Sequence, residues 1–105
     1  SMMLEGDFYP LTPYSLALDH WIAWQFNRPE SGDGVVQAFR RADCAEAAQT
    51  FRLRGLDPTA TYTLVNLDVK GMTEVTGREL AEVGVRVEVG GKPGAAVILY
   101  CQKRG

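Results

Sequence analysis

Acids, one histidine and two cysteines are the residues of this chain that could take part in acid–base, metal or nucleophilic chemistry. Glycoside hydrolysis and similar acid–base reactions need two carboxylates that converge on one pocket. The acids here are scattered over expected turns and solvent faces, for example Asp33, Asp57, Glu82 and Glu88. Acids in turns usually accept hydrogen bonds from nearby backbone N–H groups. We therefore predict that this chain contains no catalytic residue.

His20 has no second histidine and no Cys–His spacing to accompany it. A structural zinc site needs four such ligands, and no serine or cysteine motif marks His20 as a catalytic base. We expect His20 on the surface and predict no metal site. The glycines lie in expected turns and never between a strand and a real helix, so they form no phosphate-binding loop.

Cys44 lies in an expected polar loop and Cys101 near the end of an apolar strand. Two cysteines do not make a disulfide framework, so free thiols are the favoured interpretation and a disulfide is the alternative. Free thiols slightly favour a cytoplasmic protein. The N-terminus shows no charged region followed by an apolar one, so no signal peptide is predicted, and the compartment is left open.

The formal net charge of −2, with no basic run longer than Arg40-Arg41, offers no electrostatic footprint for nucleic acid or an anionic membrane. No apolar run approaches the ~18 residues that a membrane-spanning helix needs. We therefore expect a soluble domain with neither nucleic acid nor a membrane among its partners.

The elements that position these residues have the period of strands. Expected strands cover 21–28, 34–41, 50–56, 61–68, 73–75, 85–89 and 95–103. The last is apolar on both faces, which indicates a central strand. Capping-box spacing from Thr76 to Glu79 supports one helical turn at most. The sequence thus predicts an all-β fold, an antiparallel two-sheet β-sandwich of about seven to eight strands with at most one short helical turn.

Two tryptophans three positions apart in one strand, Trp21 and Trp24, must point to opposite faces. Trp24 fits the inner face together with Ile22 and Phe26, so Trp21 is expected to point outward. Its cover is then a segment of the same chain, a neighbouring domain or a sugar ring. Trp21 is accordingly a weak candidate for binding carbohydrate.

The N-terminal arm, residues 3–20, precedes the sandwich domain, residues 21–105, and residues 1–2 look like a cloning remnant. Between Gly6 and Ser15 the arm has several aromatic side chains but no helix or strand period, because two prolines fix φ and remove backbone donors. We expect it to pack on the sandwich or on a domain that is absent here. The interdomain-contact candidates are Phe8, Tyr9, Pro10, Tyr14 and Trp21.

An ordered set of segments resembles a known family over about residues 5–103. The segments are Gly-Asp-Phe-Tyr-Pro-Leu (6–11), Trp-Ile-Ala-Trp-Gln-Phe-Asn-Arg-Pro-Glu (21–30), Gly-Val-Val-Gln-Ala-Phe-Arg-Arg (34–41), Leu-Arg-Gly-Leu-Asp-Pro (53–58), Tyr62 and Thr-Gly-Arg-Glu-Leu-Ala-Glu-Val-Gly-Val (76–85). In this order and spacing they resemble the C-terminal domain of α-galactosidases of glycoside hydrolase family 36, in the melibiase clan. The Trp-x-x-Trp-Gln-Phe stretch resembles only a subgroup, so the parent's α-galactosyl specificity is left open.

The resemblance implies a parent enzyme with an N-terminal β-domain, a central (β/α)8 barrel and this β-sandwich at the end. It implies retaining cleavage of terminal α-galactosides by two aspartates on the barrel, without a metal or organic cofactor. Neither aspartate has a counterpart in these residues. We therefore expect a non-catalytic domain whose partner is the barrel and which stabilises it. The alternatives are a carbohydrate-binding module that uses Trp21 with Tyr9 and Tyr14, and a domain that assembles the parent into oligomers or self-associates through an uncovered patch.

Overall fold

The computed structural model of the chain describes residues 6–13 and 17–104. Residues 1–2, expected to be a cloning remnant, and Tyr14, an expected contact residue, lie outside this part. The described residues form eight strands and one helix. In chain order they are β1 Asp7–Pro10, β2 Trp21–Arg28, β3 Asp33–Arg40, β4 Ala48–Phe51, β5 Thr61–Asn66, β6 Thr73–Thr76, α1 Gly77–Glu82, β7 Val85–Glu88 and β8 Gly94–Gln102.

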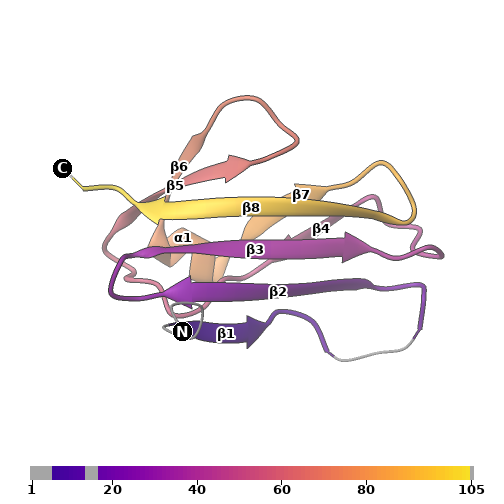
Figure 1. Cartoon of the computed structure of the whole chain (residues 1–105), viewed down its shortest axis with the longest axis horizontal. Helices are drawn as coiled ribbons and strands as arrows, with labels where there is room; N and C mark the ends of the chain where they lie inside the picture. Colours follow the sequence, from indigo (N-terminus) through magenta and orange to yellow (C-terminus); the bar gives the residue numbers. More distant parts are fainter. Residues whose placement is uncertain (1–5, 14–16, 105) are drawn as a thin grey trace.

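The strands form two antiparallel sheets, as the sequence predicts. The larger sheet has six strands in the order β1-β2-β3-β8-β5-β6, and the smaller one pairs β4 with β7. In Figure 1 the larger sheet lies toward the viewer, and β4, β7 and α1 form a second layer behind it. The two-sheet β-sandwich and its single short helix are thus confirmed for the described part of the chain.

Strand β8 lies at the centre of the larger sheet. It pairs with β3 on one side and with β5 on the other, so every second residue faces the core and the remainder face outward. Its apolar residues on both faces had indicated this position. The β2–β3 hairpin closes through residues 29–32, where Gly32 has a φ of 71° and donates its N–H to the carbonyl of Arg28 at 2.9 Å. That loop is longer than the tight two-residue type, as expected.

The core lies between the two layers. The larger sheet contributes Trp21, Ala23, Val36, Ala38, Tyr62, Leu64, Ala96, Ile98 and Tyr100, and the second layer contributes Cys44, Phe51, Leu53, Leu80 and Val87. Thr76 caps α1, because its Oγ1 accepts the N–H of Glu79 at 3.1 Å. Leu80 is fully buried, and its carbonyl accepts the N–H of Leu53 at 2.9 Å. The helix therefore fixes the position of the backbone that follows β4.

The structure corrects the bounds of two elements. Strand β4 ends at Phe51 rather than at Leu56, because the backbone beyond it bonds to α1 instead of to a strand. It also begins at Ala48, two positions before the expected start at residue 50. The capping-box spacing predicted one helical turn at most over Glu79 to Val83, and the helix starts two positions earlier, at Gly77, directly after the Thr76 cap.

The expected orientation of β2 is wrong. Trp21 faces the core and is 5% exposed, and Ala23, Gln25 and Asn27 follow it inward. Ile22, Trp24 and Phe26 lie half-buried on the opposite face. The sequence had favoured the more apolar set as the inner one. The reverse holds because the two amides find buried hydrogen-bond partners, which removes the penalty of burying them.

Those partners form a polar network inside the sandwich. Gln25 Nε2 donates to Tyr100 Oη and to the carbonyl of Arg54, both at 2.8 Å, and Gln25 Oε1 accepts the N–H of Arg54 at 2.8 Å. Tyr100 Oη donates to Asn27 Oδ1 at 2.6 Å, and Asn27 Nδ2 donates to the carbonyl of Gly55 at 3.2 Å. Burial raises the pKa of Tyr100 well above its usual range, so its hydroxyl keeps its proton.

The N-terminal arm also differs from expectation, since it contains a strand. Residues 7–10 form β1, which pairs with β2 at one edge of the larger sheet. Pro10 has no backbone N–H to donate to a neighbouring strand. An edge strand tolerates this, because one of its two sides has no neighbour that needs such a hydrogen bond. The sheet thus begins within the arm and not at residue 21. The arm was expected to pack on the sandwich or on an absent domain, and its residues 7–10 pack on the sandwich.

Tyr100→Phe should destabilise the fold by about 1–3 kcal/mol, because it removes the hydrogen bond to the buried Asn27 Oδ1 and one of the two hydrogen bonds donated by Gln25 Nε2. Tyr62→Phe is the matched control, since Tyr62 is equally buried but its hydroxyl only accepts the N–H of the exposed Asp57, at 2.9 Å. We expect that variant to lose less, because water can replace the hydroxyl. Urea unfolding followed by tryptophan fluorescence measures both, and equal losses would contradict the role of the network.

Candidate functional site

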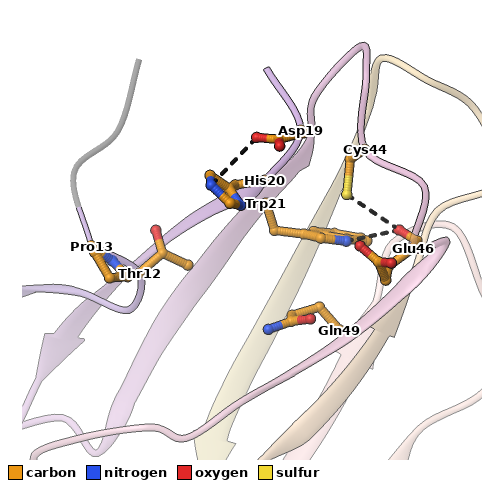
Figure 2. A pocket seen from close by; sticks show the side chains of 8 residues that line it. All are labelled: Thr12, Pro13, Asp19, His20, Trp21, Cys44, Glu46 and Gln49. Atoms are coloured by element: carbon orange, nitrogen blue, oxygen red, sulfur yellow. Dashed lines mark hydrogen bonds and ion pairs between the residues drawn. The ribbon is translucent and has the colours of Figure 1, made fainter. Parts of the chain in front are cut away.

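A cavity of about 270 Å³ opens beside the start of β2 (Figure 2). Its lining combines polar and ionisable groups from three segments of the chain. The residues are Thr12, Pro13, Asp19, His20, Trp21, Cys44, Glu46 and Gln49. It contains Trp21, the weak candidate for binding carbohydrate, and His20, the one histidine of the chain.

Trp21 does not offer its ring face to this cavity. Its indole Nε1 donates to the carbonyl of Glu46 at 2.9 Å, and its ring meets Phe51 edge-on with 5.9 Å between centroids. Sugar binding by stacking needs an exposed ring face, and Trp21 is nearly fully buried. Its cover comes from Phe51 and the loop at Glu46, a part of the same chain other than the aromatic arm.

The ionisable groups of the cavity are solvent-exposed or inert. Asp19 and His20 approach each other at 3.3 Å, with side chains 64% and 60% exposed, so His20 is the surface residue expected. Cys44 is buried, and its Sγ lies 3.6 Å from the carbonyl of Glu46. Over residues 6–13 and 17–104, no three histidines, cysteines, aspartates or glutamates gather as metal ligands. Both cysteines are free thiols, as favoured, so the disulfide alternative is wrong.

The two carboxylates with lowered pKa values, Asp33 and Asp57, accept hydrogen bonds at turns. Arg28 donates to Asp33 through Nε at 2.9 Å and Nη2 at 2.6 Å, and this hydrogen bonding lowers the pKa of Asp33. Thr59 donates its N–H and its hydroxyl to Asp57 at 2.9 and 2.7 Å, which lowers the pKa of Asp57. A general acid needs a pKa raised toward the working pH. These two acids have the opposite shift and the turn role that the sequence predicts.

The interdomain-contact candidates do not share one surface. Phe8 pairs with Phe26 and is 61% exposed, whereas Tyr9 pairs with Gln25 on the other face. Tyr9 is stacked under the guanidinium of Arg54, 5.1 Å from the ring centroid. Pro10 lies exposed on the face of Phe8, Trp21 is buried, and Tyr14 lies outside the described residues.

The sequence reasoning missed a surface that we call the outer face. It is the side of the larger sheet turned away from β4, β7 and α1, and its apolar members are Phe8, Pro10, Ile22, Trp24, Phe26, Val35, Phe39, Val65, Ala95, Val97 and Leu99. Trp24 and Phe39 pack with ring centroids 5.3 Å apart. The signal was available, since β8 is apolar on both faces.

Residues 21–100 match the family described as the glycosyl hydrolase family 36 C-terminal domain. The chain belongs to this family. The match leaves out β1 and the last two residues of β8 and covers the rest of both sheets. It includes the β2–β3 hairpin, which forms much of the outer face.

Solved structures of α-galactosidases share this fold. The galactosidase domain of the α-galactosidase–sucrose kinase AgaSK is 24% identical with a TM-score of 0.74, over 94% of this chain and 13% of its own. The α-galactosidase AgaB from Geobacillus stearothermophilus is 25% identical with a TM-score of 0.65, over 93% and 13%. The α-galactosidase from Lactobacillus brevis is 14% identical with a TM-score of 0.74, over 95% and 14%.

This family 36 domain therefore spans only 13–14% of the length of those enzymes. No curated protein matches it. In the described part of the chain, no helix has the length and apolar character to cross a membrane.

Asp33→Asn should reduce the loss of unfolding free energy that occurs as the pH falls into the acid range. A carboxylate with a lowered folded pKa contributes stability above its unfolded pKa and loses that contribution as the pH falls through its folded pKa. The contribution should be at most about 1 kcal/mol at pH 7, since the pair is partly exposed. Unfolding curves from pH 7 down to about pH 2.5 measure the difference from the unsubstituted chain.

Glu82→Gln is the control for this series. Its partner Arg78 is 3.6 Å away, and both side chains are more than 60% exposed. We expect this variant to follow the unsubstituted chain at every pH. An Asp33→Asn curve that does the same would show that the Arg28–Asp33 pair does not stabilise the hairpin.

Proposed function

We propose that this chain is a non-catalytic C-terminal accessory domain of a retaining α-galactosidase, and that it stabilises the catalytic (β/α)8 barrel of the parent enzyme. The main support is its family membership together with the small share, 13–14%, that it spans of the α-galactosidases it matches. A unit of this size supplies one domain of a large enzyme. The residues that cleave the galactoside then belong to the remainder of the parent.

The chemistry of the described acids supports this division of labour. Asp33 and Asp57 are kept ionised by hydrogen bonds within their own turns. Glu82 and Glu88 form exposed ion pairs with Arg78 and Arg86, at 3.6 and 3.4 Å. Each of these four carboxylates already has a partner within its own element or turn, and none of them lines the cavity at Trp21.

Packing alone gives such a domain a large effect on its parent. At about 25 cal/mol per Å², an interdomain contact of about 800 Å², if mostly apolar, would contribute on the order of 10 kcal/mol before ordering costs are subtracted. That exceeds the effect of any single side chain in the domain. The function of the domain is then expressed as the stability of the catalytic portion.

Deleting residues 7–104 from the full parent polypeptide should lower its apparent melting temperature by roughly 5 °C or more, because apolar surface becomes exposed. The 105-residue chain by itself should release no product from an aryl α-galactoside at any pH. Differential scanning fluorimetry and a chromogenic assay measure the two effects. The proposal fails if the isolated chain turns over and one substitution within it abolishes the turnover, or if the deletion leaves the melting temperature and activity unchanged.

A further inference from the structure

The larger sheet has one covered face and one uncovered face. Strands β4 and β7 and helix α1 pack on the covered side, where Leu80 and Val87 are fully buried. No strand or helix of the described chain packs on the outer face, which is turned toward the viewer in Figure 1. Large apolar side chains stand exposed there, with Phe8 at 61%, Leu99 at 42% and Phe39 at 38%.

The residue pattern of β2 is the reverse of the one expected in a sheet that has one solvent-exposed face. In such a sheet the apolar residues point inward and the polar ones outward. Here the amides Gln25 and Asn27 are buried, while Ile22, Trp24 and Phe26 lie on the outer face. The central strand β8 is apolar on both faces, which is typical of sheets that are covered on both sides. The pattern thus indicates a second cover.

Charge is confined to the margin of the outer face. The Arg28–Asp33 ion pair, at 2.6 Å, closes one end, and the Lys103–Glu74 pair, at 3.1 Å, lies at the β6 edge. The amide Oε1 of Gln37, between the aromatics, already accepts the indole N–H of Trp24 at 2.7 Å. A neutral apolar centre with a charged rim is the arrangement of a protein–protein contact.

A shallow groove extends the outer face past Phe39. It has a volume of about 490 Å³ and is mostly apolar, with Leu18, Phe39, Pro93 and Ala95 in its lining. Arg40 also borders it, but its guanidinium is occupied by the carbonyls of Cys44, Ala45, Val89 and Gly90 at 2.9–3.2 Å. Arg41 borders the groove as well. The apolar part of the lining, formed by Leu18, Phe39 and Ala95, can receive an apolar side chain of a partner.

We propose that the outer face packs against the catalytic portion of the same α-galactosidase polypeptide. This inference rests on the function proposed above and names the contact surface. It replaces the dispersed candidates Phe8, Tyr9, Pro10, Tyr14 and Trp21 with one continuous surface, on which Phe8 and Pro10 are retained. Its centre is formed by Trp24, Phe39 and Leu99.

The dimensions favour a tethered partner over a second copy of the domain. Five strands about 4.8 Å apart, with about five residues each at 3.4 Å, give a flat area of roughly 20 Å by 17 Å. Within-chain interfaces bury about 300–750 Å² per side, whereas stable contacts between separate chains need about 800 Å². Tethering compensates for the smaller area through a millimolar effective concentration. The matched enzymes provide such a tether, since 86–87% of each chain lies outside the match.

Thiol labelling of the full parent polypeptide tests the surface. Leu99→Cys places a reporter at the centre of the outer face, and Val83→Cys places one on the opposite layer, where Val83 is 63% exposed. Both variants also carry Cys101→Ser, because Cys101 is an exposed free thiol two positions from Leu99. Cys44, which is 1% exposed, serves as the protected reference. We expect the thiol from Leu99→Cys to react with a maleimide about tenfold more slowly than the one from Val83→Cys, because its partner must first separate. Peptide-level mass spectrometry reads each site.

Adding Phe39→Asp should remove the protection of the Leu99→Cys thiol and lower the melting temperature of the full polypeptide. Equal labelling of the two thiols in the native polypeptide, or slower labelling from Val83→Cys, would overturn the inference. Protection that disappears on dilution, together with a sedimenting dimer, would assign the surface to a second copy and likewise overturn it. Each of these results can occur while the deletion of residues 7–104 still destabilises the parent, so the surface and the proposed function fail separately.

Discussion

A buried hydrogen-bond network between β2 and β8 decides which way the larger sheet faces. Gln25, Asn27 and Tyr100 satisfy one another and the backbone of Arg54 and Gly55, and among the described residues no buried side-chain polar atom lacks a partner. Because side chains alternate along a strand, fixing Gln25 inward also fixes Trp24 outward. The nature of the outer face follows from this one constraint.

Local patterns predicted much of this fold. Alternation in β7, the two-sided apolar character of β8, the Thr76 cap of α1 and the turn acids Asp33 and Asp57 are properties of neighbouring residues. The orientation of β2 is not such a local property, because it depends on a hydrogen bond from Gln25 to Tyr100, 75 positions away. Hydrophobicity alone favours Ile22, Trp24 and Phe26 as the inner set. Strand β1 was missed for a similar reason, since an edge strand takes its conformation from its neighbour.

Local patterns could not predict the surroundings of Trp21 either. Its burial depends on Phe51 and the carbonyl of Glu46, which the alternation of residues along a strand cannot reveal. The structural role of Asp33 and Asp57 was predictable, because each accepts hydrogen bonds from a residue close to it in the sequence, Arg28 and Thr59 respectively. Membership of the family 36 C-terminal domains, the turn-bound carboxylates and the apolar outer face fit a domain whose chemistry is packing. In such a domain, specificity depends on shape and on where charge is excluded.

The central position of β8 has a consequence for biosynthesis. It is the last strand in chain order, yet it fills the gap between β3 and β5. Until the ribosome releases it, both neighbours present unpaired backbone edges that can recruit other nascent chains. A premature stop before Gly94 would leave those edges permanently open. Such a truncation product should be cleared by quality control or aggregate, even though most of the domain has been translated.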